Sequence, residues 1–198
     1  MSGNAAEARG RSPIQFRGLS RGEGRTGRLN QPDGPGHHDG MERLRIVKGD
    51  ATAPQAEGNK IIAHVCNDRG GWGKGFVLAL SRRWPEPERQ YRQWHRGRGG
   101  DDFGLGAVQL VAVQPDLWVA NMVAQHGMRP TGSTPPIRYD AVERCLQAVA
   151  GHASRLGASV HMPRIGCGLA GGKWELIEPI ITRTLCARSI VTTVYDVE

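Results

Sequence analysis

One stretch, residues 162–175 with the sequence MPRIGCGLAGGKWE, constrains the fold more than any other. It follows a short apolar run, Ala158–Met162, and precedes a helical pattern, Trp174–Leu185, so it predicts a strand, a loop and a helix start. Four glycines let this loop turn tightly and approach a ligand without side-chain clashes: Gly166, Gly168, Gly171 and Gly172. The unpaired amides at a helix start carry positive partial charge, which favours phosphate oxygens. The alternative is an ordinary strand-to-helix loop, although a plain turn needs fewer glycines.

The rest of the chain, from Met41 onward, alternates strands and helices. Strands are expected near residues 44–48, 60–65, 107–113, 117–123, 158–162 and 190–195, and helices near 76–84, 88–96, 138–156 and 174–185. We expect Pro85 and Pro87 to end the first helix. Only Gln114, Pro115 and Asp116 separate two of the strands, so those two should be antiparallel neighbours. The order predicts an α/β fold in three layers, α/β/α, with a mixed central sheet and helices on both faces.

Residues 1–40 differ in composition from the remainder of the chain. They hold nine of the 28 glycines and six arginines, and they show almost no periodic apolar pattern. Such a segment buries too little apolar surface to offset the entropy of ordering, so we expect a disordered tail. Residues 41–198 are then expected to form one domain, which folds without the tail.

Charge and cysteine content narrow the classes of ligand. Lysine and arginine together number 26 against 19 acidic residues, a net charge of +7 that favours anionic ligands. No basic stripe with interleaved aromatic residues indicates nucleic-acid binding. The four cysteines lie far apart, without the spacing of a metal site, and no apolar run suggests a signal peptide or a membrane span. We therefore expect a cytoplasmic protein with reduced cysteines, no bound metal and no membrane partner.

A second glycine-rich loop, CNDRGGWGKG at residues 66–75, also lies between an expected strand and an expected helix. Neither loop is a Walker motif, because no Gly-Lys-Ser/Thr follows the glycines. Neither is the dinucleotide fingerprint, which needs Gly-x-Gly-x-x-Gly after the first strand, and Gly73-Lys74-Gly75 in particular does not have that spacing. Ligands of open α/β sheets bind beyond the carboxyl ends of the strands. Two such loops beside one crevice suit a ligand with more than one phosphate.

With these features, the chain from about Met41 to the C-terminus resembles the macrodomain family, which binds ADP-ribose. The residues that carry the resemblance are Gly49-Asp50 after the first strand, Ala63-His64 before the first glycine loop, Met162–Leu169, and the closing Val194-Tyr195. The branch it resembles most contains terminal ADP-ribose protein glycohydrolase. This resemblance implies ADP-ribose or ADP-ribosylated proteins as partners. We expect no cofactor, and nothing in the sequence demands more than a monomer.

The resemblance also implies roles for individual residues. Asp50 matches the acidic residue that accepts a hydrogen bond from the adenine amine, with the Ala51 amide beside it. Tyr195 would lie near the adenine. From the residues alone, Asp50 could instead cap a turn, and Tyr195 could be a core aromatic at a strand end.

Both glycine loops are implied to hold the rest of the ligand. Gly166, Cys167, Gly168 and Leu169 match the loop whose amides bind the pyrophosphate. We expect four residues around the distal ribose and its phosphate. Three come from the first glycine loop, Asn67, Gly73 and Gly75, and the fourth is Gln125.

The chain departs from the glycohydrolase at two positions. Ala170 stands where that enzyme has a catalytic aspartate, and Ala124-Gln125-His126-Gly127 occupies the region of its nucleophilic lysine. A covalent lysine mechanism is therefore excluded here, because glutamine cannot form the adduct.

Hydrolysis by a positioned water remains open, with the pyrophosphate of the ligand or a side chain as the base and Asn67, Asp68 and His126 as candidate catalytic residues. Histidine is the residue type suited to act as a base near neutral pH, which favours His126, although His126 could simply bond to the backbone and Asp68 could simply pair with Arg69. Cys66 and Cys167 are expected to be small packing residues. Three functions stay open: a hydrolase that removes ADP-ribose from acidic side chains or small esters, a reader that only binds ADP-ribose, and an ADP-ribose phosphate phosphatase.

Overall fold

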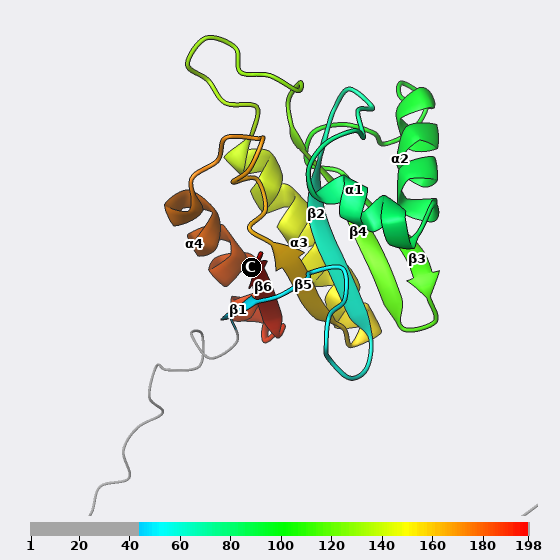
Figure 1. Cartoon of the computed structure of the whole chain (residues 1–198), viewed down its shortest axis with the longest axis vertical. Helices are drawn as coiled ribbons and strands as arrows, with labels where there is room; N and C mark the ends of the chain where they lie inside the picture. The colour runs from blue at the N-terminus through cyan, green and yellow to red at the C-terminus, as the bar shows by residue number, and fades with distance from the viewer. Residues whose placement is uncertain (1–43, 198) are drawn as a thin grey trace, which may run out of the picture. The chain divides into compact units, whose positions relative to one another are not determined.

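The structure, a computed structural model, describes residues 44–197. A six-stranded sheet forms the centre of this part of the chain (Figure 1). The tail that we expected at residues 1–40 lies outside this range. The elements of the described residues, in chain order, are β1 (Leu44–Lys48), β2 (Lys60–Asn67), α1 (Phe76–Arg83), α2 (Glu86–Arg96), β3 (Val108–Gln114), β4 (Leu117–Gln125), α3 (Tyr139–Leu156), β5 (Ser159–Pro163), α4 (Trp174–Thr184), the 3-10 helix η1 (Cys186–Arg188) and β6 (Thr192–Asp196).

The sheet is mixed, as predicted. Its strand order is β1-β6-β5-β2-β4-β3, and every neighbouring pair is parallel except β3 and β4. The short connection at residues 115–116 leaves β3 and β4 no alternative to antiparallel pairing. Strand β2 lies inside the sheet with most of its residues buried, which explains its nearly continuous apolar sequence.

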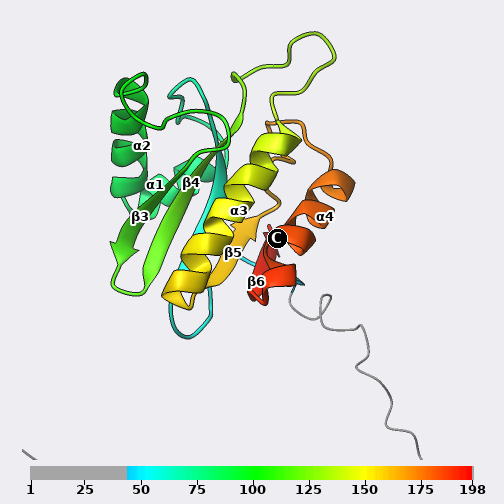
Figure 2. The same cartoon turned by 180° about the vertical axis from the view of Figure 1, so that it is seen from behind.

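Helices cover both faces of the sheet, so the predicted three layers are confirmed. Figure 1 shows α1 and α2 on one face, and Figure 2, seen from behind, shows α3 and α4 on the other. Alternate residues of β2 separate the two apolar cores, with Ile61 and Ala63 facing α3 and α4, and Ile62 and Cys66 facing α1 and α2. The sheet is therefore a rigid support with its loops at the strand ends.

Three of those loops meet at the carboxyl edge of the parallel strands, after β2, β4 and β5 (Figure 1). The pairing of β2 with β4 shifts between Cys66 and Asn67, so that Asn67 lies opposite Gln125. A bulge of this kind re-aims side chains at a strand end. It brings the first glycine loop next to the loop that comes after β4.

Four helix boundaries differ from the prediction by one or two residues: the end of α1, the start of α2, the start of α3 at Tyr139 and the end of α4 at Thr184. Helix α2 begins at Glu86 and contains Pro87 in its first turn, where the missing N–H of proline costs no hydrogen bond. Helix α1 ends at Arg83 because Trp84 is already extended. Across residues 44–197, no helix combines the length and apolar character needed to cross a membrane.

Candidate functional site

A cavity of about 960 Å³ lies at the carboxyl edge of the sheet, between the three loops. Seven of the predicted ligand residues line it: Asn67, Gly73, Gly75, Gln125, Gly166, Gly168 and Leu169. Both glycine loops therefore border one cavity, as the sequence indicated.

The loop between β5 and α4 leaves several of its amides unused. Gly166 and Gly171 have positive φ angles of 71°, and the Gly172 amide closes the loop on the Gly166 carbonyl at 2.7 Å. Among the described residues, no acceptor is within bonding distance of the amides of Gly166, Gly168 and Leu169. Free amides close together on a turned backbone make a binding site for an anion, although the Cys167 amide among them is bonded to the Arg164 carbonyl at 3.3 Å.

We expect Gly172→Ala to destabilise the fold, because a Cβ at Gly172 would overlap the Gly166 carbonyl oxygen. The obstacle is backbone, so it cannot rotate away, and overpacking of this kind costs roughly 1–3 kcal/mol. Thermal unfolding should show a melting temperature lower by about 2–4 °C for each kcal/mol. Gly73→Ala is the matched control, since a Cβ at Gly73 meets nothing within 4 Å. Equal melting temperatures for the two variants would contradict this geometry.

The cavity is electropositive. Four cationic side chains line it, and its lining residues include no carboxylate. Arg164 is bound to both Asp196 oxygens, at 2.5 and 2.9 Å, and its guanidinium lies 4.6 Å from the centre of the Trp174 ring. The other three are Arg92, which pairs with Glu88 at 2.9 Å, and Lys74 and Arg129, which make no ion pair within residues 44–197. This charge favours an anionic ligand.

His64 lines the cavity floor as a neutral side chain. Its Nε2 is 2.6 Å from the Asn121 Oδ1, which can only accept, so Nε2 carries the proton. Burial lowers the pKa of His64 to about 4 despite that hydrogen bond. His64 therefore shapes the floor without adding charge at neutral pH.

Asn67 holds its own loop together. Its Oδ1 accepts hydrogen bonds from the amides of Arg69 and Gly71, at 2.9 and 3.0 Å, and its Nδ2 donates to the Gly71 carbonyl at 2.9 Å. The Tyr91 hydroxyl donates to the Asn67 carbonyl at 2.5 Å. These contacts give Asn67 a structural task in shaping the first glycine loop, beside its place on the cavity wall.

Asp68 and His126 form a pair beside the cavity, although neither lines it. The Asp68 Oδ2 is 2.7 Å from the His126 Nδ1, and the Gly127 amide donates to Oδ1 at 2.8 Å. Burial opposes ionisation of Asp68, but the hydrogen bonds from Gly127 and His126 outweigh it and lower its pKa. An ionised Asp68 only accepts, so His126 carries its proton on Nδ1 and leaves Nε2 free as an acceptor.

The residues predicted to contact adenine lie beyond one end of the cavity and do not line it. Ala51 is buried, and the Tyr195 hydroxyl is 3.0 Å from the His161 Nδ1. The Gly49 amide, next to Asp50, donates to the Asp196 carbonyl at 2.9 Å, and Val197 lines the cavity. Asp50 therefore adjoins the end of the cavity where the chain leaves β6.

The two cysteines of the glycine loops are packed thiols. Cys66 is buried, and burial raises its pKa well above the usual value. The Cys167 thiol contacts the Ile165 carbonyl at 3.4 Å, lies against the core and has a pKa raised by burial. Both are protonated near neutral pH, so neither is an activated nucleophile.

Several cavity residues were missed from the sequence. Lys74 and Arg164 lie within the two glycine-rich motifs and could have been chosen for their charge, whereas Arg92 and Arg129 gave no signal. The structure also brings Arg83 to Asp50, a contact that no local pattern indicates. Within residues 44–197, no group of three or more His, Cys, Asp or Glu side chains could hold a metal ion.

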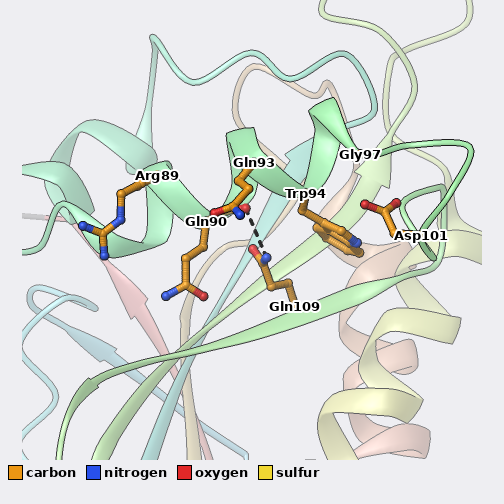
Figure 3. Close-up of a pocket in the computed structure, with 7 residues that line it drawn as sticks. All are labelled: Arg89, Gln90, Gln93, Trp94, Gly97, Asp101 and Gln109. Atoms are coloured by element: carbon orange, nitrogen blue, oxygen red, sulfur yellow. Dashed lines mark hydrogen bonds between the residues drawn. The ribbon is translucent and has the colours of Figure 1, made fainter.

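A second cavity, of about 620 Å³, lies between α2 and β3 (Figure 3). No predicted site residue lines it. Its Gln109 side chain is already occupied, because Nε2 donates to the Gln90 carbonyl at 3.1 Å and Oε1 accepts from Asn121. We therefore take the larger cavity as the candidate site.

Comparison with known proteins identifies the family. No protein-family model matches the chain. A solved structure from Streptomyces coelicolor, described as a macrodomain protein, is 59% identical, with a TM-score of 0.70 over 77% of this chain and 98% of that one. The chain belongs to the macrodomain family. The mixed sheet and the two glycine loops described above are therefore features of a macrodomain.

Two curated relatives extend the comparison. ADP-ribose 1''-phosphate phosphatase of Chaetomium globosum is 30% identical over 149 residues, 67% of this chain and 80% of that protein. Chromodomain-helicase-DNA-binding protein 1-like of Danio rerio is 35% identical over 163 residues, 77% of this chain. This macrodomain spans only 15% of the helicase-like protein's length.

Proposed function

We propose that this macrodomain binds ADP-ribose in the larger cavity and hydrolyses the ester that joins ADP-ribose to acidic side chains of proteins. The observation that carries the proposal is the set of unpaired amides at Gly166, Gly168 and Leu169, in a cavity lined by cations and no carboxylate. A pyrophosphate satisfies these amides. The relative named ADP-ribose 1''-phosphate phosphatase supports an ADP-ribose ligand.

The position of the pyrophosphate determines where the rest of the ligand lies. The distal ribose would lie toward Gly73, Gly75 and Gln125. Of these, Gln125 adjoins the Asp68–His126 pair, since its carbonyl accepts from the Asp68 amide at 2.9 Å. The adenine would lie at the opposite end, toward Asp50 and Tyr195. This orientation puts the bond to be broken next to a candidate base.

The proposed reaction needs one water and one base. Water attacks the anomeric carbon of the distal ribose, the bond from that carbon to the ester oxygen breaks, and the protein carboxylate leaves with the electron pair. His126 Nε2 takes the proton from the water and returns it to solvent, while Asp68 stabilises the imidazolium. The products are ADP-ribose with a free anomeric hydroxyl and an unmodified carboxylate.

Position 170 supports a mechanism different from that of the glycohydrolase that the chain resembles. Ala170 is only 5% exposed, packs with the core beneath α3 and α4, and accepts from the Ile137 amide at 3.1 Å. The base must then come from another loop, and the Asp68–His126 pair is the one beside the cavity.

Two measurements test the proposal. Calorimetric titration should give saturable binding of ADP-ribose, and a protein mono-ADP-ribosylated on glutamate should lose its label when incubated with the macrodomain. No binding of ADP-ribose would refute the whole proposal. Binding without release of the label would identify a reader. Release of phosphate from ADP-ribose 1''-phosphate, without action on the glutamate ester, would identify a phosphatase.

A further inference from the structure

The Asp50 carboxylate is held by three groups of the protein itself. Its Oδ1 accepts from the Thr52 amide at 2.8 Å and from the Thr52 hydroxyl at 2.7 Å. Its Oδ2 accepts from Nη2 of Arg83 at 3.1 Å. The Asp50 side chain is 54% exposed, yet its orientation is fixed on both oxygens.

Arg83 also binds Thr52, the residue that holds the other oxygen of Asp50. Its Nε donates to the Thr52 hydroxyl at 2.6 Å, so one guanidinium spans both members of the turn. Thr52 is buried, whereas Arg83 comes from the last turn of α1, 33 positions away from Asp50 in the chain. A planar guanidinium can bind two acceptors in one fixed geometry, which a lysine cannot do. The contact therefore ties the turn after β1 to α1.

We propose that Arg83 is a positioning residue that sets the adenine specificity of the site, by orienting Asp50 toward the exocyclic amine of the ligand. This inference rests on the proposed binding of ADP-ribose with its adenine near Asp50. A carboxylate oxygen has two acceptor positions, and Thr52 takes both on Oδ1, so Oδ2 can accept from the amine while keeping its contact with Arg83. Without Arg83, Oδ2 loses its fixed partner and the Thr52 hydroxyl loses its donor, so part of the ordering of Asp50 falls on the ligands that use it.

The consequence is a selective loss of affinity. A ligand that donates a hydrogen bond to Asp50 gains from its orientation, and a ligand without the amine gains nothing. Arg83→Gln should therefore weaken ADP-ribose roughly tenfold. In the same variant, the affinity for an analogue whose purine carries hydrogen in place of the amine should stay within about twofold of its original value.

The experiment measures the dissociation constants of both ligands by calorimetry, for the unsubstituted chain and four variants. Asp50→Ala gives the full loss of discrimination, and Arg83→Lys, which keeps the charge, should recover part of it. Arg82→Gln is the matched control, because Arg82 is exposed on the same helical turn and makes no ion pair within residues 44–197. Circular dichroism confirms folding.

The outcomes separate this inference from the proposed function. Loss of ADP-ribose affinity in Arg83→Gln, with the analogue spared, supports it. Equal weakening of both ligands would make Arg83 a general structural residue and overturn the inference, as would an effect no larger than that of Arg82→Gln. An unsubstituted chain that binds both ligands equally overturns it too, while leaving ADP-ribose binding intact. No binding of ADP-ribose at all would overturn both proposals.

Discussion

Gly168→Glu is expected to abolish ADP-ribose binding, with a loss of affinity of at least about 100-fold, while leaving the fold intact. Gly168 lines the cavity, and a Cβ there meets nothing within 4 Å, so the protein itself has room for a side chain. The glutamate would fill the space of the pyrophosphate with bulk and with a like charge. Calorimetry measures the affinity, and circular dichroism with thermal unfolding checks the fold.

Cys167→Ser is the partner experiment, because it separates a backbone cradle from a reactive thiol. The Cys167 thiol faces the core and a carbonyl, so the serine variant should keep both binding and hydrolysis. A thiol nucleophile would instead require binding without turnover in this variant. If Gly168→Glu is folded and binds ADP-ribose normally, the pyrophosphate does not lie on this loop.

His126→Gln is expected to lower kcat for the glutamate-linked substrate by roughly 100-fold or more, the usual contribution of a general base. Glutamine keeps similar bulk and polarity but cannot take a proton from water. The affinity for free ADP-ribose should stay within about twofold, because His126 does not line the cavity. Single-turnover release of the label measures the chemical step separately from binding.

Two further variants sharpen this test. Asp68→Asn keeps a hydrogen-bond acceptor near His126 but removes the charge that stabilises the imidazolium, so kcat should fall less than in His126→Gln. His152→Gln is the matched control, since His152 lies on α3 and outside the cavity lining. Unchanged kcat in His126→Gln would mean that another group activates the water.

Much of the fold was predictable because its signals are local. The apolar run of β2, the periodic apolar face of α3 and the glycine after it each report on a few neighbouring residues, and all of these elements form as expected. The prolines do end α1, which stops just before Trp84 and Pro85, but the start of α2 was placed two residues late because Pro87 lies in the first turn of the next helix. When two prolines lie two residues apart, local sequence does not show which of them ends one helix and which lies in the first turn of the next.

The site was less predictable where it depends on contacts between distant residues. Asp68 and His126 were each named from the sequence, but they meet across 58 positions, and only the fold makes them a pair. Arg83 carried no signal, because a basic residue in the last turn of a helix is ordinary. The two glycine loops were predicted from the sequence because each is a single short segment whose glycines and backbone amides are local features.

The loop from Gly166 to Gly172 has a consequence for how such sites change during evolution. What it presents to a ligand is a sequence of torsion angles and free amides, including φ angles of 71° at Gly166 and Gly171. If the proposed function holds, side chains around the loop, such as that at position 170, could change without loss of the anchor for the phosphates. The groups that do the chemistry could then differ between relatives that share one ligand.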